Sequence, residues 1–423
     1  MKLYLALLFL FPSVSFAYLD PGTGNALVYL LLTIGGAFIY FFKRIFYIIV
    51  GFFNPHYKET QSKKRKAQVT LYCEGITYWY TFKPIIEELI NRKIYFRYLT
   101  NDIEDPGLKI YNTYMQSKYV GQGQSSYAKI GRSQGLFFVA TTPNIGCKGY
   151  PLRRPKQIKT MIHVSHTVGD LSYLKQGSID NYDVIMDIGN WCEERLRKIE
   201  QIRHLTPKKW LAVGLPYLDE LEKTVKENKN ESNGTPCILI APSWGNKNSL
   251  IVHGTQYLFD LLNSGYKVIL RPHPQSWHFD KELLDEILQK SSKYPNFILD
   301  KEIDANNSMS QADLLISDSS SFRFDFAFLY KRPVITMEVP LSDLSTFEAG
   351  LLGGPWEVNT VPKLGAVIKK GHDAELKTVI DKLLISNKDE IKKQINTLYD
   401  ELVVNHGNSA KAIVDYMVKE GLN

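Results

Sequence analysis

Short apolar runs alternate with amphipathic stretches from Gln68 to about residue 385. The apolar runs have the length of buried strands, and the stretches between them place apolar residues at helical spacing. Strands are predicted at 69–72, 94–99, 136–140, 160–164, 183–188, 236–241, 266–270, 297–299, 314–316 and 333–335. Strands that alternate with helices in this way predict an α/β fold with parallel sheets.

The pattern also divides the chain into domains. A polar stretch, Lys223 to Thr235, has no apolar face and is predicted to link a first Rossmann-like domain at 68–230 to a second at 236–385. Amphipathic patterns at 388–402 and 408–419 predict helices within a C-terminal segment, 386–423, which we expect to pack back on the first domain. The Gly-rich stretch at 347–354 is expected to form a mobile loop.

The amino-terminal region reads as a membrane segment. Residues 1–17 resemble a signal peptide, and 18–53 contain an uncharged apolar run that predicts a transmembrane anchor. A re-entrant or interfacial helix is the alternative. Basic residues cluster just after the apolar run and in the linker 54–67, so we expect the domains that follow to lie on the cytoplasmic side of the inner (cytoplasmic) membrane. They are Lys43, Arg44, Lys58, Lys63, Lys64, Arg65 and Lys66.

Composition narrows the classes of partner. The chain has 44% hydrophobic and 22% charged residues, which is typical of a globular protein. The net charge of +7 agrees with anionic lipids, a phosphorylated substrate or nucleic acid. Because the basic cluster at 63–66 lies beside the apolar run, it indicates membrane lipids, and no nucleic acid partner is predicted. The four cysteines form no C-x-x-C pair, so we expect no metal site and no disulfide framework.

The stretch 312–340 combines a strand, a hydroxyl-rich turn, a helix and a second strand. The turn holds Asp318, Ser319, Ser320 and Ser321 ahead of an aromatic-rich helical run, Phe322 to Tyr330. Serine hydroxyls and free backbone N–H groups at a helix N-terminus can hold a phosphate. The alternative is that Asp318 or one of the serines only caps the helix.

Two histidines follow predicted strands directly. His166 lies in the loop after the strand at 160–164, and His273 lies between two prolines after the strand at 266–270, next to Arg271. In α/β sheets ligands bind outside the carboxyl ends of the strands. A histidine there can act as a general base or donate a proton to a phosphate, and arginine can bind phosphate through two N–H groups. The alternative for each histidine is a structural role, which we expect for His163 within its strand.

Five motifs resemble one known family. APSW (241–244), LRPHP (270–274), ADLLISDSSSFRFDFAFLYKRPVI (312–335), VSHTVGD (164–170) and VGLPYLDEL (213–221) resemble motifs of CDP-glycerol glycerophosphotransferases, which build teichoic-acid-type polymers. The resemblance covers roughly residues 140–390. It implies a GT-B-like fold, in which two Rossmann-like domains face a cleft, and it implies no metal and no cofactor.

The resemblance also implies roles for individual residues. His166 and His273 match the two catalytic histidines of the family, and Ser319, Ser320 and Asp325 match its donor- and phosphate-binding element. The expected partners are a CDP-linked polyol donor and a lipid-linked or glycan acceptor. As a hypothesis, His166 deprotonates the acceptor hydroxyl, His273 and Arg271 stabilise the departing CMP, and the turn Ser319–Ser321 holds the diphosphate.

Two other functions fit the same pattern. A glycosyltransferase that moves a sugar from a UDP-sugar to a lipid-linked acceptor would have a similar cleft. A membrane-tethered nucleotide-binding scaffold would bind the donor without turnover. A comparison of CMP release with UDP release distinguishes the two enzymes.

Overall fold

The computed structural model describes residues 66–142, 144–145, 150–225, 234–302, 304–340 and 343–422. Residues 66–423 form one compact unit. The predicted signal peptide, membrane anchor and nearly all of the basic linker lie outside the described residues. Within the described ranges, no helix is both long and apolar enough to cross a membrane.

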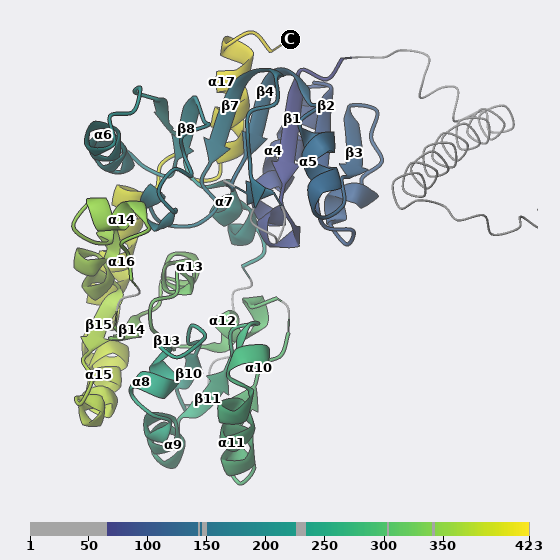
Figure 1. Ribbon diagram of the computed structural model, residues 1–423. Coiled ribbons are helices and arrows are strands. Elements are labelled where there is room, and N and C mark those ends of the chain that lie inside the picture. Colours follow the sequence, from purple (N-terminus) through teal and green to yellow (C-terminus); the bar gives the residue numbers. More distant parts are fainter. Residues whose placement is uncertain are drawn as a thin grey trace, which may run out of the picture. The chain divides into compact units, whose positions relative to one another are not determined.

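The first half of the described chain forms a parallel sheet of seven strands (Figure 1). Its order across the sheet is β3-β2-β1-β4-β7-β8-β9. The bounds are β1 Val69–Cys73, β2 Phe96–Thr100, β3 Met115–Tyr119, β4 Gln134–Ala140, β7 Gln157–Val164, β8 Val184–Asp187 and β9 Lys209–Ala212. A separate antiparallel pair joins β5 (Asn144–Ile145) to β6 (Tyr150–Pro151).

The second half forms a parallel sheet of six strands in the order β12-β11-β10-β13-β14-β15. The bounds are β10 Cys237–Ile240, β11 Lys267–Leu270, β12 Phe297–Leu299, β13 Leu314–Ser317, β14 Val334–Met337 and β15 Gly365–Ile368. Both sheets are doubly wound, because the chain first builds strands in one direction and then returns to the centre to build in the other. The direction reverses between β1 and β4 in the first sheet and between β10 and β13 in the second. At such a point the loops diverge and leave room for a ligand at the carboxyl ends of the strands. The predicted α/β fold with parallel sheets is confirmed.

Helices connect the strands in both halves. The α-helices are α4 Trp79–Asn91, α5 Gln124–Ile130, α6 Cys192–Ile202, α7 Pro216–Glu222, α8 Ser249–Val252, α9 Gln256–Asn263, α10 Ser276–Phe279, α11 Lys281–Ser291, α12 Asn306–Gln311, α13 Phe322–Tyr330, α14 Glu348–Leu351, α15 Leu376–Asp381, α16 Lys388–Leu402 and α17 Ser409–Lys419. The short helices are η2 Ile76–Tyr78, η3 Pro106–Lys109, η4 Leu171–Tyr173, η5 Trp356–Asn359, η6 Val361–Leu364, η7 Asp373–Glu375 and η8 Lys382–Ser386.

The two long C-terminal helices have different packing partners. Ile413, Val414 and Met417 of α17 belong to the hydrophobic cluster beneath the first sheet. Tyr399 of α16 instead contacts Phe328 of α13, with the ring centroids 4.9 Å apart. The expectation that these helices pack on the first domain is correct for α17, whereas α16 contacts both halves: the hydroxyl of Tyr399 also donates to Glu222 of α7 at 2.6 Å, and Nε1 of Trp191 donates to the carbonyl oxygen of Leu402 at 3.0 Å. The buried rings on α13 offer α16 an apolar surface within the second half.

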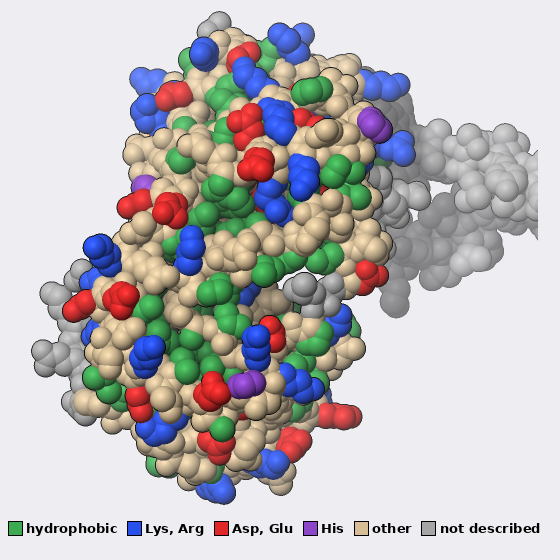
Figure 2. Space-filling model, turned by 90° about the vertical axis from the view of Figure 1, so that its left-hand side faces the viewer, with side chains coloured by type: hydrophobic (Ala, Val, Ile, Leu, Met, Phe, Trp, Pro, Cys, Tyr) green, Lys and Arg blue, Asp and Glu red, His purple; other side chains and the backbone are tan. Residues whose placement is uncertain are grey.

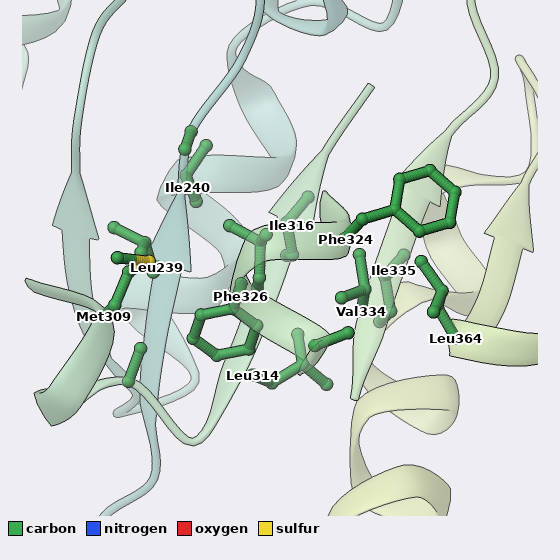
Figure 3. Close-up of a cluster of buried hydrophobic side chains, with 14 of the residues drawn as sticks. Leu239, Ile240, Met309, Leu314, Ile316, Phe324, Phe326, Val334, Ile335 and Leu364 are labelled. Atoms are coloured by element: carbon green, nitrogen blue, oxygen red, sulfur yellow. The ribbon is translucent and has the colours of Figure 1, made fainter. Parts of the chain in front are cut away.

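Helix α13 is almost entirely buried at the centre of the second half. All residues from Arg323 to Leu329 are buried. Figure 3 shows Phe326 lying against β10 and β13, while Phe324 extends toward the β14 side, near Leu364. The helix is buried on all sides because it is covered by the sheet and by other parts of the chain, and the two charged residues inside it, Arg323 and Asp325, have polar partners. Its N-terminus is therefore held in a fixed place at the end of β13.

Acidic and basic side chains are interspersed over the face shown in Figure 2. No single patch of one sign of charge covers this face. A mixed surface of this kind gives little long-range attraction for a polyanion.

Candidate functional site

The serine turn connects β13 to α13. Ser319 and Ser321 are exposed and Ser320 is half-buried. Ser321 is the N-cap residue of α13 but makes no capping bond through its side chain. The hydroxyl oxygen of Ser320 accepts one bond, from the N–H of Phe322 at 3.3 Å. The helix start therefore keeps exposed hydroxyls beside the positive end of the helix dipole, which is where an anion is bound most favourably.

Asp318 has a different role from the capping role that the sequence left open. Its side chain is fully buried. One carboxylate oxygen accepts the N–H of Ser243 at 2.9 Å, and the other accepts the N–H of Ser249 at 2.7 Å. These bonds join the loop after β10 to the loop after β13, on both sides of the point where the strand order reverses. Asp318 thus fixes the floor of the crevice in which ligands are expected.

Arg323 shapes the serine turn and was not singled out from the sequence. It is buried, and its Nε donates to the carbonyl oxygen of Ser320 at 2.9 Å. Its Nη2 lies 3.1 Å from Oε1 of Glu357 in η5. One guanidinium therefore connects the turn to a segment well beyond β14. A single arginine within an otherwise aromatic run was the available signal, because a buried arginine needs such partners.

His273 lies in the loop after β11, half-buried, and its ring stacks on Trp244 at 6.1 Å between centroids. Nδ1 of His273 accepts the N–H of Gln275 at 3.1 Å. Burial lowers the pKa of His273, so the neutral ring prevails near pH 7. Because Nδ1 is an acceptor, the neutral ring carries its proton on Nε2, which is left to donate to an anion.

Arg271 is held by a second buried carboxylate. Its Nη1 lies 2.5 Å from Oδ2 of Asp300, which follows β12. Asp300 also accepts the hydroxyl of Ser308 and the N–H of Glu302. The pKa of Asp300 is lowered, since these hydrogen bonds and the Arg271 charge outweigh its burial. The pair fixes the guanidinium at the carboxyl end of β11, close in sequence to His273.

His166 follows β7 in the first sheet. Its ring meets the ring of Tyr78 edge-on, at 4.9 Å between centroids. Nδ1 of His166 is buried and has no hydrogen-bond partner among the described residues. Burial lowers the pKa of His166 to about 4, so the imidazole is neutral and can accept a proton. Tyr78 in η2, which follows β1, was missed because an isolated aromatic residue carries no signal of its own.

His163 is buried within its strand, as expected for a structural histidine. The ring packs edge-on against Tyr182, with the ring centroids 5.3 Å apart. Burial lowers the pKa of His163 to about 3. The His163 ring is therefore neutral and places no positive charge near His166.

The loop that carries His166 is fixed by Asp187 at the end of β8. Oδ1 of Asp187 accepts the hydroxyl of Ser165 at 2.8 Å. Farther along the loop, Gly169 lies against Trp356 of η5, where a Cβ atom would come within 3.3 Å of Nε1 of Trp356. The loop therefore contacts the second half of the chain directly, and a side chain at Gly169 would disturb that contact.

Asp325 is buried inside α13, with 7% of its surface exposed. Its Oδ2 accepts the hydroxyl of Tyr217, from α7, at 3.2 Å, and its Oδ1 is buried with no partner among the described residues. Burial raises the pKa of Asp325 to about 7. The geometry joins α13 to α7 in the first half of the chain.

We expect Asp325→Asn to change the pH dependence of stability. The Asp325 carboxyl is protonated in the folded protein below pH about 7, whereas in the unfolded chain it ionises near pH 4. Unfolding therefore releases a proton between these values, and the free energy of unfolding of the wild type falls as pH rises through this window. Between pH 5 and pH 8, the free energy of unfolding of the variant should therefore rise relative to that of the wild type by on the order of 2 to 4 kcal/mol. Denaturant unfolding at pH 5, 6, 7 and 8 measures this difference.

Asp285→Asn on α11 is the matched control, because Asp285 is exposed. The difference in free energy of unfolding between this variant and the wild type should be the same at all four pH values. A constant difference between Asp325→Asn and the wild type at all four pH values would show that Asp325 is ionised in the folded protein.

A pocket of about 610 Å³ opens beside the serine turn. Ser319 and Arg323 line it on one side, with Met337 and Val367 from the ends of β14 and β15. Tyr173 of η4 reaches it from the first half of the chain. The volume and the apolar lining with a few polar groups are typical of a small-molecule site. Within the described residues, no group of His, Cys, Asp and Glu side chains could hold a metal ion.

Solved structures of similar fold include sugar-nucleotide and teichoic-acid enzymes. The wall teichoic acid polymerase TagF, in a histidine variant soaked with CDPG, is 18% identical with a TM-score of 0.54, over 85% of this chain and 90% of that chain. A putative UDP-N-acetylglucosamine 2-epimerase from Listeria monocytogenes is 12% identical with a TM-score of 0.57, over 84% and 96%. The UDP-GlcNAc 2-epimerase of Methanocaldococcus jannaschii, in complex with UDP-GlcNAc and UDP, is 13% identical with a TM-score of 0.53, over 83% and 99%. These likenesses agree with the GT-B-like fold.

The sequence match identifies the family. No curated protein matches the chain. Residues 193–418, more than half of the chain, match the family described as CDP-Glycerol:Poly(glycerophosphate) glycerophosphotransferase. The matched region contains His273, the serine turn and the loop after β10. The chain therefore belongs to the CDP-glycerol:poly(glycerophosphate) glycerophosphotransferase family and is a CDP-glycerol glycerophosphotransferase-like enzyme.

Proposed function

We propose that the enzyme moves glycerol phosphate, or a similar polyol phosphate, from a CDP-linked donor to a hydroxyl group of a cell-envelope glycan or lipid-linked acceptor. The observation that carries this proposal is the serine turn at the N-terminus of α13. It lies where the strand order reverses, with His273 following β11, the neighbour of β10. The positive end of a helix dipole, hydroxyl groups and a nearby N–H donor together form a favourable site for a diphosphate.

In the proposed reaction the acceptor oxygen attacks the β-phosphorus of the donor. The new P–O bond forms as the bond from the β-phosphorus to the bridging oxygen breaks, and CMP leaves with that oxygen. His166 takes the proton of the acceptor hydroxyl, for which its neutral imidazole is suited. The N–H at Nε2 of His273 and the Arg271 guanidinium stabilise the charge that develops on CMP.

The pocket beside the serine turn would hold the nucleoside of the donor. Ser319 lines this pocket, so a nucleoside within it would bring its diphosphate to Ser319, Ser320 and Ser321. Asp325 lies deeper in α13, and we propose that it acts indirectly by holding α13 against α7 through Tyr217.

We also propose that residues 18–53 anchor the enzyme in the cytoplasmic membrane, with the described unit on the cytoplasmic side. The long apolar run and the basic residues that follow it support this proposal. Membrane lipids would then be partners of the basic linker, and a lipid-linked acceptor would be presented close to the site.

A second function, transfer of a sugar from a UDP-sugar, is favoured by one observation: a similar fold occurs in a UDP-GlcNAc 2-epimerase in complex with UDP-GlcNAc and UDP. A donor comparison tests both. Purified full-length protein with membrane extract as acceptor source should release CMP from CDP-glycerol at least ten times faster than UDP from any UDP-sugar in a panel. Preferential UDP release would establish the glycosyltransferase, and donor binding without release of either nucleotide would establish a scaffold.

A further inference from the structure

An exposed aromatic surface lies beside His273. Trp244, in the loop after β10, is 46% exposed, and Phe279, at the end of α10, is 58% exposed. Their rings are stacked, with centroids 5.1 Å apart and planes 29° apart. The Trp244 ring stacks in turn on His273, also at 29°. We call Trp244 and Phe279 the aromatic platform. Large side chains exposed together on a water-soluble surface commonly mark a binding site.

The backbone on both sides of Trp244 is anchored. The N–H of Ser243 donates to Asp318 at 2.9 Å, and the N–H of Gly245 donates to Oδ2 of Asp280 at 3.1 Å. Asp318 is fully buried and Asp280 is 7% exposed. Gly245 has φ of +80°, which a residue with a Cβ atom adopts only with strain. Trp244 therefore stands on a fixed loop, and a ligand on its face would bind without the entropy cost of ordering that loop.

Strand order places the platform relative to the pocket. The platform and His273 follow β10 and β11, whereas the pocket is lined mainly by residues at and after the ends of β13, β14 and β15, together with Lys247 and Val252 farther along the segment after β10. The serine turn after β13 stands between them. A donor with its nucleoside in the pocket and its diphosphate at the turn would therefore direct its transferable end toward His273. The acceptor must approach from the side of the platform.

We propose that the aromatic platform is the acceptor subsite and that it binds a sugar ring of a saccharide-bearing acceptor. This inference rests on the proposed function. The face of an aromatic ring is negative, and it attracts the positively polarised C–H groups on the face of a pyranose ring. The stacked rings of Trp244 and Phe279 form an aromatic surface against which the C–H face of a pyranose ring can pack. An acceptor made only of glycerol phosphate units has no ring to stack there.

The test measures acceptor preference in Phe279→Ala, because Phe279 does not contact His273. The readout is the ratio of kcat/KM for methyl glycosides of glucose, galactose and N-acetylglucosamine to kcat/KM for glycerol, with CDP-glycerol as donor. We expect this ratio to fall at least tenfold in Phe279→Ala and to stay within twofold in Phe279→Tyr. Ile385→Ala, which removes an exposed apolar side chain from η8, should leave the ratio unchanged. Since Phe279 is exposed, the variant should fold, which thermal unfolding checks.

A binding measurement separates this subsite from the proposed reaction. Saturation-transfer NMR should show contact between the same methyl glycosides and the wild type, and lose it in Trp244→Ala and Phe279→Ala. If the wild type releases no CMP with any acceptor, the proposed function fails, but loss of glycoside contact in the variants would still support the subsite. Unchanged ratios and unchanged contact would overturn it. So would a loss of binding to anionic phospholipid vesicles in Phe279→Ala with unchanged glycoside preference, because the platform would then be a membrane contact.

Discussion

Replacing His166 with alanine should lower the rate of CMP release from CDP-glycerol by about 10²–10⁴-fold. The neutral imidazole at the end of β7 is the proposed base, and no water at neutral pH replaces a positioned base efficiently. His166→Gln, which keeps much of the side-chain volume, should be equally impaired while unfolding at nearly the wild-type temperature. Release of CMP by purified protein, followed by chromatography, measures the loss.

His372→Ala is the matched control for this experiment, because His372 is an exposed histidine of the second half of the chain, paired with Glu375, whereas His166 follows a strand of the first sheet. It should retain full activity. The pH profile gives a second readout. Because burial lowers the pKa of His166 to about 4, the acid limb of kcat/KM should fall below pH 5. Near-normal CMP release by both His166 variants would refute the assignment of His166 as the base.

Replacing His273 should reveal which ring nitrogen acts. His273→Ala is expected to lower kcat by about 10²–10³-fold, the usual cost of losing a donor to developing charge. Because Nδ1 accepts the N–H of Gln275, the active donor is Nε2–H. Glutamine places an amide N–H near the position of Nε2, whereas asparagine places its amide near Nδ1. We therefore expect His273→Gln to keep more activity than His273→Asn, in single-turnover measurements of CMP release.

The opposite order, with His273→Asn the more active, would mean that Nδ1 carries the function. Equal and near-normal activity in both would remove His273 from the mechanism. Circular dichroism and thermal unfolding serve as controls for folding, since the prolines on both sides of His273 keep the loop rigid in each variant.

The sequence predicted the central elements of the fold because their apolar runs are strong. The predicted strands at 69–72, 236–241 and 314–316 lie within or around β1, β10 and β13, and the predicted helix Phe322 to Tyr330 coincides with α13. Three strands of the two parallel sheets, β3, β9 and β15, were not predicted. β3 reads MQSKY and has one buried residue at the sheet edge, and β15 begins with glycine. The Gly-rich stretch at 347–354, expected to be mobile, contains α14, in which Glu348 is buried beside Arg203.

The candidate site was predicted only in part, for a physical reason. Residues directly after strands, such as His166 and His273, could be found because strand ends meet at one edge of a sheet. Arg323 and Trp244 lie within the quoted motifs, but their contacts with Glu357 and His273 depend on segments far away in the sequence, as does the contact of Tyr78 with His166. Asp325 is an example. The motif suggested that its carboxylate binds phosphate, but the sequence could not show its burial beside Tyr217, because that burial depends on how α7 packs against α13.

The most direct test of the central claim is to follow acceptor and nucleotide together. The full-length protein is incubated with CDP-glycerol and lipid-linked glycan extracted from membranes, and the acceptor is analysed by mass spectrometry while CMP is quantified. The account predicts that the acceptor gains glycerol phosphate units, with one CMP released for each unit gained, and that His166→Ala abolishes both. A mass gain that matches a sugar, with UDP released from a UDP-sugar and no product from CDP-glycerol, would contradict it.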